Sequence, residues 1–92
     1  MSFNYEDLEH RFNCACHDVV QELSVQYKSD YQSGGPGRLT AFLDIIKKQF
    51  DEIEGSFIRH NGIAEDHEAL RRIKAIAKLF AKRCVDDYGK IL

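Results

Sequence analysis

Ser33-Gly34-Gly35-Pro36-Gly37 is the stretch that decides how this chain of 92 residues folds. Three glycines and the only proline make a helix or strand costly to continue through it, because glycine adds backbone freedom and proline removes a backbone donor. A connector is therefore predicted over residues 33–37. A second break is predicted at Asn61-Gly62, since both residue types tolerate the left-handed conformation that ends helices. The two breaks divide the chain into three segments.

The first segment carries a clear helix start at Asn4, a good N-cap residue. Glu6 and Asp7 then lie in the first turn, and Phe3 is placed to pack on Leu8 as a hydrophobic staple. Apolar residues recur at steps of three and four, which predicts a helix to about Tyr27 with one face toward a core. That face comprises Leu8, Phe12, Ala15, Cys16, Val19 and Leu23.

The end of this segment also fits a strand, because Leu23, Val25 and Tyr27 alternate with polar residues. Residues 23–31 would then pair with residues 38–46 in a hairpin across the glycine connector. An α+β fold is therefore the structural alternative.

The two later segments show stronger helical patterns. In the second, apolar residues alternate at steps of four and three, the seam along which helices pack at shallow angles. This seam comprises Leu39, Leu43, Ile46, Phe50, Ile53 and Phe57. In the third, one face collects Ala69, Ile73, Ile76, Ala77, Phe80 and Cys84. Three amphipathic helices can enclose a common core, so we predict an all-α, compact three-helix bundle in which residues 1–92 form a single helical domain.

Composition excludes several classes of protein. Apolar residues make up 43% and charged residues 30%, which is unlike a disordered chain, and no apolar run reaches the ~18 residues of a membrane span. The acidic start lacks the features of a secretory signal, so we expect a cytoplasmic protein with no membrane partner. The three cysteines are expected to remain thiols.

The strongest charge feature lies in the third segment, where six basic residues occur between Glu68 and Asp86 with no acid among them. Several of them step by three and four along the face opposite the apolar one, and Leu79 lies near this exterior. Residues 61–92 carry a net charge of plus two and residues 1–60 of minus four. The candidate partner or nucleic-acid binding residues are Arg71, Arg72, Lys74, Lys78, Leu79, Lys82 and Arg83. The alternative interpretation is a solvated helix exterior.

A second cluster combines His10, Cys14 and His17, which share a face of the first predicted helix. Zinc accepts imidazole and thiolate ligands, but three ligands on one helix face would leave the metal open to water. The same side chains point outward without a cleft, which is unsuitable for cysteine catalysis. We expect no catalytic residues, no metal and no cofactor, and we interpret the protein as a non-enzyme.

Two functional hypotheses follow. The first is a noncatalytic binding protein, a small inhibitor or adaptor that docks on a larger protein or ribonucleoprotein assembly. The second is a nucleic-acid-binding regulator that uses the basic face of the third helix and whose affinity falls steeply with salt.

In size, lack of catalytic motifs and two-sided charge, the chain looks like the small accessory proteins that phages encode, notably anti-CRISPR proteins. The resemblance implies docking on a CRISPR surveillance complex in the host cell cytoplasm. It also implies contacts with Cas proteins and guide RNA that block target DNA binding. The basic face of the third helix would then contact the RNA or the DNA path.

Overall fold

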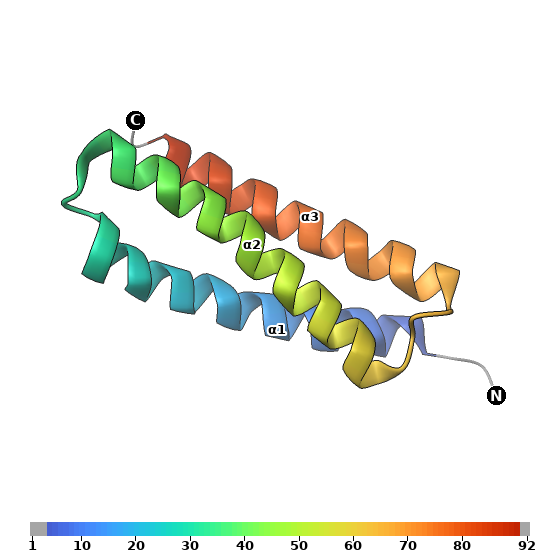
Figure 1. Ribbon diagram of the computed structural model, residues 1–92. Coiled ribbons are helices and arrows are strands. Elements are labelled where there is room, and N and C mark those ends of the chain that lie inside the picture. Colours follow the sequence, from blue (N-terminus) through green and yellow to red (C-terminus); the bar gives the residue numbers. More distant parts are fainter. Residues whose placement is uncertain (1–3, 91–92) are drawn as a thin grey trace.

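The computed structural model describes residues 4–90, which form an elongated bundle of three helices (Figure 1). These are α1 (Tyr5–Gln26), α2 (Gly35–Asn61) and α3 (His67–Gly89), with a π-helical turn, η1 (Tyr27–Tyr31), extending α1. α1 and α3 run in one direction, and α2 runs antiparallel to both and packs on each of them. The bundle is 52 Å long and 18 Å across in both other directions.

The all-α prediction is confirmed, and the hairpin alternative is not favoured. Residues 23–31 continue α1 into η1, residues 38–46 lie inside α2, and residues 4–90 contain no strand. Within the same range no helix is long and apolar enough to cross a membrane.

The predicted helix ends agree with the capping chemistry. Asn4 Oδ1 accepts a hydrogen bond from the Asp7 backbone N–H at 3.0 Å, whereas the predicted Phe3 staple lies outside the described residues. Gly62 ends α2 at a φ of 63°, the left-handed conformation expected there. The first connector is shorter than predicted, because α2 already begins at Gly35. Proline fits a first helical turn, whose N–H groups have no acceptor within the helix.

The three predicted apolar faces meet in one core. Most of their members are buried, while Ala15, Leu43, Ile53, Phe57 and Ile76 are half-buried. Phe42 lies outside the predicted seam but is fully buried. α2 therefore buries a wider face than the predicted seam, which has only two apolar residues in every seven. A wider buried face is expected for a helix that packs on two neighbours.

Aromatic rings surround Phe42 at one end of the rod. Its ring centroid lies 5.2 Å from that of Tyr27, 5.1 Å from Tyr31 and 4.9 Å from Tyr88. η1 supplies the first two rings one turn apart, and α3 supplies the third. This cluster joins the last turn of α3 to the connection between α1 and α2.

Candidate functional site

The basic residues of α3 lie on the outside of the bundle. Arg71, Lys74, Lys78, Lys82 and Arg83 are exposed, because the apolar face of the same helix is buried against α1 and α2. Arg72 is half-buried. The sequence analysis thus located the charged exterior of this helix, although the side chains differ in what they contact.

Arg72 contributes to the bundle itself. Its Nη1 donates to Glu9 Oε1 of α1 at 2.6 Å and its Nε to Glu68 Oε1 at 2.8 Å. Its guanidinium also lies 4.9 Å from the ring centroid of Tyr5. A guanidinium that bridges two carboxylates and covers an aromatic face is held in place on three sides. Arg72 therefore joins α1 to the start of α3.

Arg71 shares the same acidic partner. Its Nε donates to Glu68 Oε2 at 3.0 Å, and hydrogen bonds from Arg71 and then Arg72 lower the pKa of the Glu68 carboxyl to about 2. Close beside them, Tyr5 Oη donates to Asp66 at 3.0 Å, and Asp66 Oδ1 caps α3 by accepting from the Ala69 N–H at 3.1 Å. The first two positions of the basic face are thus satisfied by acids of the chain itself.

The remaining cations differ from these two. Within residues 4–90, Lys74, Lys78, Lys82 and Arg83 form no ion pair within 4 Å. An exposed cation without an internal partner retains its charge for an external one. These four side chains are the part of the basic face available for binding.

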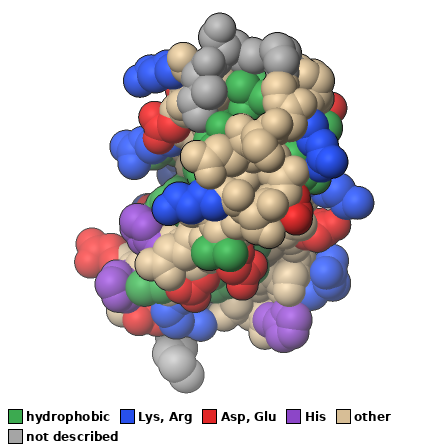
Figure 2. All heavy atoms as spheres, turned by 90° about the vertical axis from the view of Figure 1, so that its left-hand side faces the viewer, with side chains coloured by type: hydrophobic (Ala, Val, Ile, Leu, Met, Phe, Trp, Pro, Cys, Tyr) green, Lys and Arg blue, Asp and Glu red, His purple; other side chains and the backbone are tan. Residues whose placement is uncertain are grey.

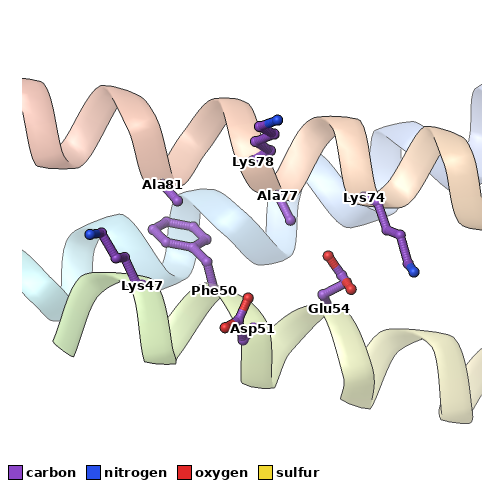
Figure 3. A pocket seen from close by; sticks show the side chains of 8 residues that line it. All are labelled: Lys47, Phe50, Asp51, Glu54, Lys74, Ala77, Lys78 and Ala81. Atoms are coloured by element: carbon purple, nitrogen blue, oxygen red, sulfur yellow. The ribbon is translucent and has the colours of Figure 1, made fainter. Parts of the chain in front are cut away.

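A groove runs between α2 and α3 beside these lysines (Figure 3). It has a volume of about 440 Å³, and Phe50, Ala77 and Ala81 form its floor. Its rims are charged, with Lys47, Asp51 and Glu54 from α2 and Lys74 and Lys78 from α3. Nothing in the sequence connects Lys47 to the basic face, because only the antiparallel packing of α2 on α3 brings it there.

Glu54 is the most constrained charge of this groove. Its side chain is half-buried, and desolvation raises the pKa of its carboxyl despite the opposing effect of Lys74. Asp51 adds a smaller repulsion in the same direction. No hydrogen bond or ion pair within 4 Å holds this carboxylate among the residues that the structure describes. Its charge is therefore incompletely compensated within the chain.

Leu79 lies on the other flank of α3, toward α1. It is 47% exposed and lines a shallow hollow of about 330 Å³ with Ala75, Ile76 and the paired arginines. An exposed leucine next to unpaired Lys82 and Arg83 provides an apolar contact beside charged ones, which is typical of protein interfaces.

The end of the rod carries charges of both signs. Figure 2 views the end where α2 begins and α3 ends, and shows Lys and Arg side chains on both flanks with Asp and Glu side chains interspersed among them. Such an arrangement differs from a uniformly cationic coat.

The predicted cluster on α1 is dispersed. Cys14 Sγ lies 3.9 Å from His10 Nε2 on the exposed face, while the His17 ring packs edge-on against Phe80 of α3 at 5.1 Å. Across residues 4–90, no group of three or more His, Cys, Asp or Glu side chains is arranged to hold a metal ion.

The other two cysteines are core residues. Cys16 and Cys84 are buried free thiols, as the sequence analysis interpreted them. Burial raises the pKa of Cys16 to about 12 and also raises that of Cys84, which keeps both thiols protonated and poorly nucleophilic.

Comparison with known proteins adds no family assignment: no protein-family model, no curated protein and no solved structure matches the chain.

Proposed function

We propose that this chain is a noncatalytic binding protein, a small inhibitor or adaptor that docks through the exterior of α3 on a larger protein or ribonucleoprotein assembly. One observation carries the proposal: Lys74, Lys78, Lys82 and Arg83 project outward and form no ion pair within residues 4–90. Exposed cations without an internal ion pair attract an oppositely charged surface over about a Debye length.

Mixed chemistry on the two flanks of α3 supports a protein or ribonucleoprotein rather than naked nucleic acid as the partner. Leu79 offers an apolar contact, and Asp51 and Glu54 place negative charge beside the lysines of the groove. A phosphate backbone would be repelled by these carboxylates, whereas a protein surface can supply groups for both signs.

A CRISPR surveillance complex is the first assembly to test. Its guide RNA offers negative charge to the lysines, and its Cas proteins offer groups of both signs. Docking there would block target DNA binding and would take place in the cytoplasm of the host cell. This extension of the proposal is based on the general resemblance to phage-encoded anti-CRISPR proteins.

A nucleic-acid-binding regulator is the second candidate function. Lys74, Lys78 and Lys82 are spaced by four residues, about 6 Å along the helix axis, so they form a regular row of cations. Such a row suits repeated phosphates and predicts binding that weakens steeply with salt.

The test uses a double variant, Lys82→Glu with Arg83→Glu, in which two basic residues outside the groove become acidic. We call it the α3 variant. The control, Lys28→Glu with Lys48→Glu, makes the same change in net charge at exposed positions off α3. Tagged proteins are incubated with nuclease-treated or untreated lysate of a CRISPR-bearing host, and bound proteins are identified. We expect the α3 variant to lose partners that the wild type and the control retain. Equal capture by all three proteins would refute docking through α3.

The same variants separate the two candidates. A labelled single-stranded RNA and a DNA duplex are titrated at low and moderate salt by fluorescence anisotropy. A nucleic-acid regulator would bind both, and the α3 variant would lower the magnitude of the salt slope on the duplex by about two. Protein partners retained after nuclease treatment, with weak binding to these probes, would favour the inhibitor or adaptor.

A further inference from the structure

Opposite charges face each other across the groove between α2 and α3. Asp51 and Glu54 form the α2 rim, and Lys78 and Lys74 lie at matching levels on the α3 rim (Figure 3). Lys47, the one cation of the α2 rim, lies level with the small, uncharged Ala81. One rim is therefore largely acidic and the other basic over the same length of the rod.

Glu54 shows that these rims are not compensated within the molecule. Its half-buried carboxylate has no ion pair within 4 Å in the described range, although Lys74 is near enough to influence it. A partly desolvated carboxylate is costly until a cation pairs with it closely. A partner that covers this groove should therefore bring a cation to Glu54 and an anion to Lys74.

We infer that the partner is a second copy of this chain, packed groove against groove with a two-fold axis parallel to the long axis of the rod. This symmetry places α2 of each copy on α3 of the other at the same level. Each Glu54 then meets Lys74 of the second copy, and each Asp51 meets Lys78, so every pair occurs twice in the interface. A two-fold axis across the rod would instead set α3 against α3 and oppose lysine to lysine.

The apolar surface and the area suit such a dimer. Beyond the floor of Phe50, Ala77 and Ala81, half-buried apolar residues continue one turn further along both rims. These are Leu43, Ile58, Leu70 and Val85. The outline of one face of the rod, 52 by 18 Å or roughly 900 Å², is large enough to contain the ~800 Å² per partner of a stable interface. The small alanines also allow close approach of the facing helices.

This inference goes beyond docking on an external partner. The dimer covers Lys74 and Lys78, so an external partner that docks on the dimer contacts Leu79, Lys82 and Arg83, which lie outside the groove. Self-association and external docking can therefore be tested with different substitutions.

Sedimentation velocity and light scattering, over a range of protein concentrations at low and high salt, test the dimer. We expect the wild type to approach twice its mass of 10.6 kDa as concentration rises. Glu54→Lys or Lys74→Glu alone opposes like charges at two places. Each should raise the dissociation constant about a hundredfold, because each like-charge contact costs a factor of at least about ten.

Mixing Glu54→Lys with Lys74→Glu is the decisive arm. In the mixed dimer every altered carboxylate or ammonium meets an opposite charge, so association should return toward the wild-type strength, although each variant alone dimerises about a hundredfold more weakly. Attraction within one chain cannot produce this rescue. Glu52→Lys on the opposite flank of α2 and Lys82→Glu outside the groove are the matched controls, and both should retain the dimer.

Circular dichroism of each variant checks that its helices are retained. A wild type that stays at the monomer mass at every concentration would overturn the inference. So would a mixture that fails to associate where the wild type does, or a Glu52→Lys control as defective as Glu54→Lys. Loss of external docking in the Lys82→Glu and Arg83→Glu variant leaves all of these readouts unchanged, so the two proposals fail separately.

Discussion

Phe42→Ala should destabilise this protein more than any exposed substitution. The side chain is fully buried, and three tyrosine ring centroids lie 4.9 to 5.2 Å from its own. Truncation removes its transfer free energy and leaves a cavity among rings drawn from η1 and α3. Such Phe→Ala changes cost about 3 to 5 kcal/mol, and we expect the upper part of this range because several rings lose their partner.

This loss is large relative to the total free energy of unfolding of the protein. At roughly 0.05 to 0.15 kcal/mol per residue, a chain of this length has a free energy of unfolding of about 5 to 14 kcal/mol. Each kcal/mol lowers the midpoint temperature of a domain of this size by about 4 to 8 °C. The variant should therefore melt at least about 12 °C below the wild type.

Urea unfolding followed by circular dichroism measures the change directly, and tyrosine fluorescence reports on the same cluster because the chain has no tryptophan. Phe42→Leu should cost less, since it retains most of the apolar volume. Val25→Ala is the exposed control, because Val25 is 69% exposed, and it should stay within about 0.5 kcal/mol. A loss below about 1 kcal/mol for Phe42→Ala with an unchanged m-value would refute the described packing.

Three further predictions concern titrating groups. In the folded protein at mildly alkaline pH, a thiol reagent should label Cys14 alone, and Cys16 and Cys84 only after unfolding; rapid labelling of all three would contradict their burial. The unfolded Cys16 thiol ionises at its ordinary pKa of 9.0 and the folded one at about 12, so the free energy of unfolding should fall as pH rises through this window. Glu68 behaves oppositely: its two arginine partners lower its pKa from 4.5 to about 2, so its contribution to stability is present above pH 4.5 and is lost as pH falls toward 2. Glu68→Gln should therefore flatten the acid limb of the stability curve measured by circular dichroism, and identical acid limbs would contradict the ion-pair network.

Local patterns predicted the helices well and their exact packing less well. The caps at Asn4 and Gly62 are visible in the sequence because each depends on one residue and its immediate neighbours. Phe42 was missed because a seam counted at steps of three and four describes a helix with one neighbour, whereas α2 packs on both α1 and α3. The connector was predicted too long, since Pro36 disfavours a helix interior but fits a first turn.

The candidate site likewise combines features that the sequence predicts with features that depend on packing between helices. The sequence identified the cations on the exterior of α3, but gave no means of separating Arg72, which pairs with Glu9 of α1, from unpaired Lys82. It also gave no reason to place Lys47 beside that face. No sequence signal links these residues, because the spacing between them has no fixed period.

By itself, the sequence determined where α1 begins and α2 ends, that α2 and α3 carry helical apolar faces, and which side of α3 is basic. These properties follow from hydrogen bonding and side-chain periodicity within a few turns of one helix. Only the tertiary structure decided which acid lies opposite which base, and so which charges remain uncompensated along the α2–α3 groove. The register between helices is set by how buried side chains of different segments fit together, and that fit depends on the whole core at once.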